Sequence, residues 1–173
     1  MDLNKYIRDI PDFPKKGIVF KDITTLLKNA EAYTFVINNL YERYKDKKID
    51  KVIGIEARGF IIAASLATKL NCGIVLIRKV NKLPYETYKH EYVLEYGTDC
   101  IEIHKDSIDD DENIILVDDV LATGGTIEAA IALISNFNCH LIESAFLIEL
   151  AFLNGKDKFP SSNDNYYSLL KIK

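Results

Sequence analysis

One segment constrains the fold of this chain more than any other. It is a short apolar run that leads into two aspartates, a loop of small residues and a helix-forming stretch. Residues 114–117 are Ile-Ile-Leu-Val, Asp118 and Asp119 follow, and residues 122–126 read Ala-Thr-Gly-Gly-Thr. Residues 127–134 are mostly Ile, Ala and Leu, which suit a helix. This order predicts a buried strand, an acidic turn, a loop that fits a phosphate group, and a helix. Such an arrangement can hold a sugar and its phosphate together.

Apolar strands alternate with helical spacing along the rest of the chain. Residues 51–55 and 73–77 predict buried strands, and a fourth is expected at about residues 141–148. Helical spacing covers residues 30–46 and 60–70. Buried strands separated by helices predict an α/β fold with a mostly parallel sheet and helices on both faces. Ligands of such sheets bind at the carboxyl ends of the strands.

An N-terminal arm and a hairpin interrupt this alternation. Prolines within residues 1–28 predict an arm without regular helix, in which residues 17–22 are extended. Residues 79–90 are polar and predict a loop. Apolar and polar residues alternate on both sides of residues 97–99, which predicts a hairpin with its turn there.

Composition narrows the class of protein. A chain of 173 residues can bury one core, so we expect a single domain over residues 1–173. A net charge of −4 does not favour nucleic-acid binding, and no apolar run approaches the roughly 18–20 residues that span a membrane. The first residues lack the apolar segment of a secretory signal. Cys72, Cys100 and Cys139 have no metal-ligand spacing and predict free thiols in a cytoplasmic protein.

The loop after the aspartates has the features of an anion site. Gly124 and Gly125 permit a tight turn in which backbone N–H groups face a phosphate, and the hydroxyls of Thr123 and Thr126 can add donors. The sequence around the loop is not that of a nucleoside-triphosphate P-loop. A plain turn that joins strand to helix is the alternative interpretation.

The adjacent carboxylates of Asp118 and Asp119 repel each other, so the pair costs stability unless a cation or hydroxyl groups lie against it. A ribose diol, or a magnesium ion through water, would serve. Alternatively, one carboxylate faces a helix N-terminus and the other faces solvent. The nearby phosphate loop favours the sugar.

The run Val117–Thr126 resembles the phosphoribosyl-diphosphate signature of the type I phosphoribosyltransferases. Further segments narrow the resemblance to the adenine phosphoribosyltransferases, and the match runs in order from about residue 10 to residue 171. These segments are Phe13-Pro14, Gly17–Ile23, Ala57–Phe60, Leu76–Lys79, Lys82–Pro84 and Leu94–Gly97.

The resemblance implies the type I phosphoribosyltransferase fold. It has a small N-terminal hood, here residues 1–28, and a flap loop and hairpin, here residues 79–105. It also implies a reaction in which adenine and 5-phosphoribosyl 1-diphosphate give AMP and diphosphate, with Mg²⁺ as cofactor, in a homodimer. No direct protein ligand to Mg²⁺ is expected, because the diphosphate and water would hold the ion near Asp118 and Asp119.

The resemblance also implies roles for residues at the ribose, phosphate and diphosphate. Asp118 and Asp119 would face the ribose hydroxyls, and Arg58 would lie beside the diphosphate as a catalytic residue. The peptide Glu56-Ala57 or Ala57-Arg58 would be cis. The 5′-phosphate would be held by Ala122, Thr123, Gly124, Gly125 and Thr126. Further diphosphate cations, partly donated across a dimer interface, would be Arg78, Lys79 and Lys82.

The flap and the base site are implied in the same way. Glu95 matches the flap carboxylate that handles a proton of the adenine imidazole ring, and Tyr96 and Tyr88 belong to the flap. Adenine binding falls to four residues. These are Val19, Phe20, Lys21 and Leu150.

Two positions depart from the family pattern. Lys21 stands where Arg is common, which removes a forked donor, and Tyr85 stands where Gly is frequent in the flap. Two alternatives stay open. Enzymes that act on hypoxanthine and guanine carry an acid where this chain has Ala122, which argues against those two bases. The same position does not exclude a xanthine enzyme, which is the first alternative. A regulator that binds phosphoribosyl diphosphate without catalysis is the other, and the presence of Arg58 and Glu95 favours an enzyme.

Overall fold

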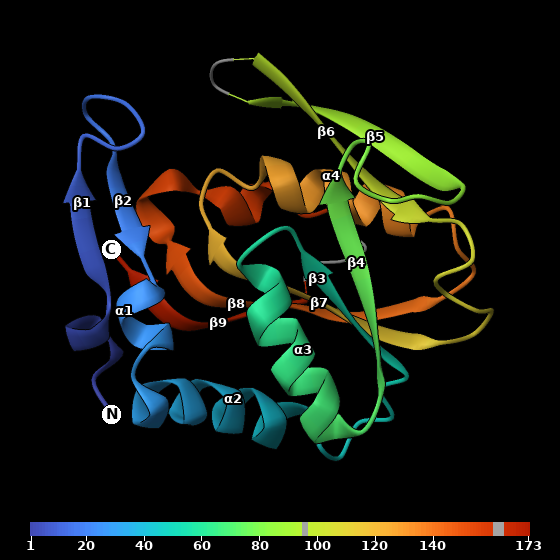
Figure 1. The fold of residues 1–173 in the computed structure, drawn as a ribbon, viewed down its shortest axis with the longest axis horizontal. Helices are drawn as coiled ribbons and strands as arrows, with labels where there is room; N and C mark the ends of the chain where they lie inside the picture. The colour runs from blue at the N-terminus through green and yellow to red at the C-terminus, as the bar shows by residue number, and fades with distance from the viewer. Residues whose placement is uncertain (95–96, 161–164) are drawn as a thin grey trace.

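A seven-stranded sheet forms the centre of the molecule, in the strand order β5-β6-β4-β3-β7-β8-β9 (Figure 1). The computed structural model describes residues 1–94, 97–160 and 165–173. Five neighbouring strands, β4-β3-β7-β8-β9, run parallel, whereas β6 pairs antiparallel with both β4 and β5. The strands are β3 Lys51–Ile55, β4 Gly73–Lys79, β5 Thr87–Leu94, β6 Gly97–His104, β7 Asn113–Leu121, β8 His140–Leu150 and β9 Tyr166–Ile172. The prediction of a mostly parallel central sheet is confirmed.

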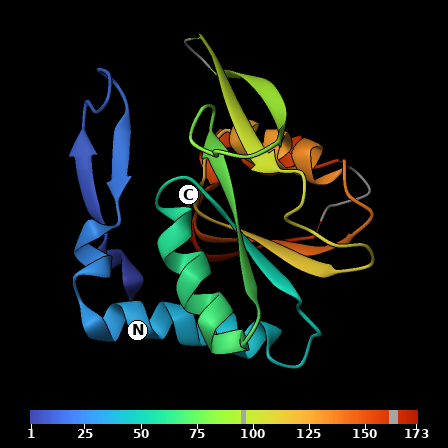
Figure 2. The same cartoon turned by 45° about the vertical axis from the view of Figure 1, so that its right-hand side comes forward.

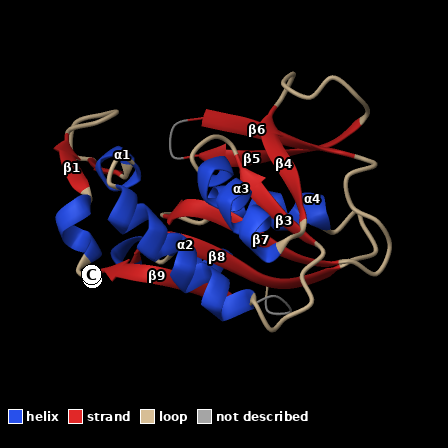
Figure 3. Cartoon of the chain, turned by 60° about the horizontal axis from the view of Figure 1, so that its bottom comes forward, coloured by secondary structure: helices blue, strands red, loops and turns tan. Residues whose placement is uncertain are grey.

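Helices cover both faces of this sheet, as buried strands require. Helices α2 (Ala30–Tyr44) and α3 (Gly59–Leu70) pack into one apolar core, and α4 (Gly125–Ile134) packs into a second core with β5 and β6. Neighbouring residues of β3 alternate between the cores, since Val52 belongs to the first and Ile53 to the second. Figure 3 shows the sheet running from the β5–β6 hairpin to β9 at the opposite edge.

The N-terminal arm forms a separate two-stranded sheet at one side of the molecule (Figures 1 and 2). Strand β1 (Arg8–Pro11) pairs antiparallel with β2 (Val19–Asp22), so the extended conformation expected there is present. The expectation of no regular helix fails at α1 (Thr24–Leu27), one helical turn. The cause is burial, because Ile23 and Leu26 are fully buried against the core of α2 and α3.

The β5–β6 hairpin differs from its predicted form. The loop expected over residues 79–90 is shorter, because β5 begins at Thr87 and pairs along its whole length, from Thr87 opposite His104 to Leu94 opposite Gly97. The turn predicted at residues 97–99 is wrong, since these residues belong to β6. Continuous cross-strand pairing outweighs the turn preference of Gly and Asp here.

The C-terminal region completes the sheet. Strand β9, which the apolar runs did not predict, pairs parallel with β8 at the sheet edge. No helix in the described part of the chain is long and apolar enough to cross a membrane. The short 3-10 helices are Leu3–Tyr6, Ala151–Leu153 and Gly155–Lys158.

Candidate functional site

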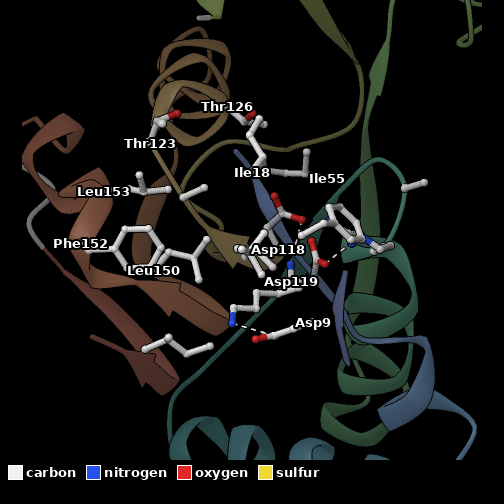
Figure 4. A pocket seen from close by; sticks show the side chains of 18 of the residues that line it. Asp9, Ile18, Ile55, Asp118, Asp119, Thr123, Thr126, Leu150, Phe152 and Leu153 are labelled. Atoms are coloured by element: carbon white, nitrogen blue, oxygen red, sulfur yellow. Dashed lines mark hydrogen bonds and ion pairs between the residues drawn. The ribbon is translucent and has the colours of Figure 1, made fainter. Parts of the chain in front are cut away.

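A cavity of about 1020 Å³ lies at the carboxyl ends of β3, β4 and β7 and extends to the N-terminal hairpin. In Figure 4, Asp118 and Asp119 lie at its centre, Thr123 and Thr126 lie at the start of α4, and Leu150 lies on another side. The ligand site expected at the carboxyl ends of the strands therefore corresponds to a real cavity.

The two aspartates belong to the end of β7, so the acidic turn predicted for them is wrong. Asp118 pairs in register with Phe146 of β8, which keeps the strand regular at this point. Asp119 is only 4% exposed, and its backbone N–H donates to Oδ1 of Asp118 at 2.9 Å. Burial, and then the charge of Asp119, raise the pKa of Asp118 well above its usual value. Burial also raises the pKa of Asp119, against the opposing charge of Arg58.

Arg58 reaches the aspartates from the loop between β3 and α3. Its Nε lies 2.8 Å from Oδ2 of Asp119, and its guanidinium carbon lies 4.7 Å from the centre of the Phe20 ring. Its Nη1 is buried and has no hydrogen-bond partner among the described residues. The cis peptide of this loop is Glu56-Ala57, one of the two predicted positions. The site therefore holds a buried cationic donor that a bound anion could satisfy.

The loop into α4 depends on Gly124. This residue has a φ of +86°, and a Cβ there would lie 2.4 Å from the carbonyl oxygen of Gly155. Ala122, Thr123 and Thr126 line the cavity. Helix α4 has no side-chain N-cap, so its first N–H groups remain available to an anion. Gly155 is equally restricted, because its Cβ would lie 2.2 Å from the Ala122 carbonyl oxygen. The sequence contains no local signal for that second glycine.

The expected base-binding residues line the other end of the cavity. Val19, Phe20, Lys21 and Leu150 all contribute to its wall. The Nζ of Lys21 lies 2.7 Å from Oδ1 of Asp9, which fixes the amine within the hairpin. The sequence analysis did not identify four further apolar residues of this wall, although their apolar character was visible in the sequence. They are Ile18, Phe152, Leu153 and Ile172.

The expected cations divide into two groups. Lys79 lines the cavity, whereas Arg78 and Lys82 do not. The guanidinium of Arg78 pairs with Glu56, with Nε 3.2 Å from Oε2, and Nη1 donates to the Lys82 carbonyl oxygen at 3.3 Å. The side chain of Lys82 is exposed. This chain alone therefore brings one of the three cations to its own cavity.

The flap residues also divide. Tyr88 packs edge-on against Phe137, with ring centres 5.4 Å apart, and does not line the cavity. Tyr92, which lies on the same face of β5 as Tyr88 but nearer its end, does line the cavity. It was missed because alternation does not say how far along a strand a cavity extends. Glu95 and Tyr96 lie outside the described residues. No group of three or more His, Cys, Asp or Glu in the described ranges could hold a metal ion.

Comparison with known proteins agrees with this geometry. A family model described as "Phosphoribosyl transferase domain" matches residues 22–172. The chain is 57% identical over 171 residues to adenine phosphoribosyltransferase of Geotalea uraniireducens, covering 99% of each chain. It superposes on the crystal structure of adenine phosphoribosyltransferase from Thermoanaerobacter pseudethanolicus with a TM-score of 0.93 and 46% identity, covering 99% of this chain and 98% of that one.

A second solved structure carries ligands. The enzyme of Saccharomyces cerevisiae, complexed with adenine and an imino-altritol bisphosphate, is 37% identical with a TM-score of 0.90. The match covers 98% of this chain and 97% of that one.

Proposed function

Because the chain belongs to the adenine phosphoribosyltransferase family, we propose that it transfers the phosphoribosyl group of 5-phosphoribosyl 1-diphosphate to adenine, which gives AMP and diphosphate. The chain has the type I phosphoribosyltransferase fold of its structural relatives. It is a pentosyl-transferring enzyme of purine salvage.

One observation carries this proposal. A single cavity combines a buried pair of carboxylates, an uncapped helix N-terminus and an aromatic, apolar end. These three environments suit a ribose diol, a 5′-phosphate and a purine base, in that order. A substrate that spans all three is a purine nucleotide or its precursors.

The reaction exchanges two bonds at C1′ of the ribose. The bond from C1′ to the diphosphate oxygen breaks, a nitrogen of adenine bonds to C1′, and positive charge develops on the ribose between these events. The carboxylates of Asp118 and Asp119 hold the ribose hydroxyls and stabilise this charge. Arg58 donates from Nη1 to the departing diphosphate, and the N–H groups at the start of α4 hold the 5′-phosphate.

Adenine binds between the hairpin and the end of β8. Phe20 offers a ring face, the extended backbone at Val19 and Lys21 offers a carbonyl and an N–H, and Leu150 closes the apolar side. As the bond to C1′ forms, the adenine ring loses a proton, which the carboxylate of Glu95 accepts in this proposal.

A magnesium ion would neutralise part of the diphosphate charge and so improve it as a leaving group. The residues present fit such an ion held through water and diphosphate. Asp118 and Asp119 are the carboxylates at the centre of the cavity, and Oδ2 of Asp119 accepts no hydrogen bond from a described residue although it pairs with Arg58.

A homodimer and a cytoplasmic location belong to the same proposal. Ile74 and Leu76 project from one face of β4 and are 41% and 37% exposed, and Ile61 of α3 is also exposed. Burial of these residues against a second copy would be favourable. Arg78 and Lys82, which lie outside the cavity of their own chain, would then be available to the partner. The free thiols Cys72, Cys100 and Cys139 suit the reducing cytoplasm.

A comparison of four bases tests the proposal. The purified chain, supplied with Mg²⁺ and 5-phosphoribosyl 1-diphosphate, should consume adenine far faster than hypoxanthine, guanine or xanthine. Equal or faster use of an oxo-purine would refute adenine as the substrate. Light scattering during size-exclusion chromatography should give the mass of two chains, and a stable monomer would refute the dimer.

A further inference from the structure

The hairpin wall of the cavity carries a side-chain network that the mechanism above does not use. Tyr92 of β5 and Asp99 of β6 lie directly opposite each other, and Lys79 of β4 lies opposite Ile101, two residues further along β6. Opposed residues, and residues two apart on a strand, share one face of a sheet. Lys79, Tyr92 and Ile101 line the cavity, so this shared face is the one that meets the ligand.

Asp99 is the centre of this network. Its Oδ2 forms an ion pair with the ammonium of Lys79 and accepts a hydrogen bond from the Tyr92 hydroxyl at 3.3 Å. Its Oδ1 accepts the backbone N–H of Cys100 at 2.8 Å. The side chain of Lys79 is 48% exposed and that of Asp99 is 21% exposed, so the ion pair lies at the open side of the wall.

The charges of this network oppose the binding of an anion. The resemblance to the phosphoribosyltransferases implies that Lys79 binds diphosphate, but in this structure its ammonium is already neutralised by Asp99. An incoming diphosphate must therefore take the ammonium from that carboxylate. Loss of the Lys79–Asp99 ion pair costs the protein little stability, because a partly exposed ion pair contributes little.

Asp99 does not lose all its partners when Lys79 leaves. It keeps the Cys100 N–H and the Tyr92 hydroxyl, which avoids the cost of an unsatisfied carboxylate. Burial raises the pKa of Tyr92, although a hydrogen bond with Thr126 acts in the opposite direction. The phenol therefore stays protonated at neutral pH and remains a donor.

We propose that Asp99 competes with diphosphate for the ammonium of Lys79 and thereby limits the affinity of the site for diphosphate. The inference rests on the proposed function, in which diphosphate leaves from this cavity. Asp99 touches neither the base nor the ribose in this scheme. It tunes how tightly the leaving group is held and how readily diphosphate departs as product.

Calorimetric titration of the full chain with inorganic diphosphate and Mg²⁺ tests the proposal. Asp99→Asn keeps the shape and can still accept from Tyr92, but it releases Lys79, so diphosphate should bind about twofold to fivefold more tightly. Glu86→Gln is the matched control. It removes the same charge from an exposed ion pair with Lys105 of the same hairpin, where Lys105 Nζ lies 3.1 Å from Oε2. Its diphosphate affinity should equal that of the unaltered chain.

A double-variant cycle identifies the route of the effect. Lys79→Ala should weaken diphosphate binding, and adding Asp99→Asn to it should then change nothing, because the contested ammonium is absent. Unchanged or weaker binding by Asp99→Asn alone, an equal gain in Glu86→Gln, or a full gain that persists without Lys79 would each overturn the competition. If the unaltered chain neither binds diphosphate nor converts adenine, the proposed function itself fails, which is a separate outcome.

Discussion

The Nε of Arg58 lies 2.8 Å from Oδ2 of Asp119, which joins the first strand-to-helix loop of the sheet to the end of β7. The pair forms where two parallel strands end side by side, and the guanidinium also lies over the ring of Phe20 from the N-terminal hairpin. One arginine thus connects the three parts of the chain that surround the cavity. Among the described residues Asp118 has no equivalent ion pair.

The unequal partners of the two aspartates predict unequal effects on stability. Asp118→Asn should raise the free energy of unfolding at pH 7, because it removes a buried carboxylate whose pKa is raised by burial and by Asp119. Turnover should fall, since the ribose loses an anionic partner. Asp119→Asn should stabilise the fold less than Asp118→Asn does, because it also removes the counter-charge of Arg58. Denaturant unfolding of both variants measures the difference.

The stability difference between Asp118→Asn and the unaltered chain should depend on pH, and the direction of that dependence is fixed. A raised carboxyl pKa in the folded state favours the protonated form, so the unaltered chain loses stability as pH rises above the ordinary value of 3.8 through the raised pKa. Below 3.8 the carboxyl is neutral in both the folded and the unfolded chain. The advantage of Asp118→Asn should therefore vanish at low pH, and an advantage independent of pH would contradict this account.

Replacement of Gly124 tests the geometry of the phosphate loop. Gly124→Ala should destabilise the fold by about 3 kcal/mol or more, because the new Cβ combines a positive φ with a collision with the Gly155 carbonyl oxygen. Gly17→Ala is the matched control. Gly17 has a φ of +90° but nothing within 4 Å of the added Cβ, so only about 1 kcal/mol should be lost. If thermal unfolding showed equal losses of stability in the two variants, backbone strain and not the collision with Gly155 would explain the effect at Gly124.

Asp22 anchors the N-terminal hairpin and predicts sensitivity to acid. Its carboxylate accepts from the Thr24 N–H at 2.8 Å and from Arg8, and these contacts lower its pKa to about 2. A lowered pKa adds stability above 3.8 that is lost as pH falls towards 2. Asp22→Ala should cost about 2 kcal/mol at pH 7, and this cost should shrink as the pH falls through 2. Asp9→Ala, which removes an exposed ion pair with Lys21, should cost under about 1 kcal/mol.

Glu95 is expected to handle the adenine proton. Glu95→Gln should lower kcat by about tenfold to a hundredfold or more while the affinity for 5-phosphoribosyl 1-diphosphate stays nearly unchanged, because the amide cannot accept that proton. Steady-state rates with both substrates varied give the two parameters. Turnover equal to that of the unaltered chain would remove this role from Glu95.

Local sequence predicted the elements whose signals are local. Apolar runs at residues 51–55 and 73–77 became β3 and β4, and the helical spacing over residues 30–46 became α2. Strand β9 and the full length of β5 were not predicted, because pairing stabilises each of them, β9 with β8 and β5 with β6. Gly155 was missed for a similar reason, since the restriction on it comes from Ala122.

The sequence by itself determined the alternation of buried strands and helices and the character of the phosphate loop, because apolar periodicity, glycines and adjacent charges are properties of neighbouring residues. Only the tertiary structure decided that Asp119 pairs with Arg58, that Lys79 pairs with Asp99, and that Arg78 and Lys82 lie outside the cavity. These outcomes depend on which strand ends lie side by side and on how deeply each charge is buried. Both depend on the packing of the sheet and not on neighbouring residues in the chain.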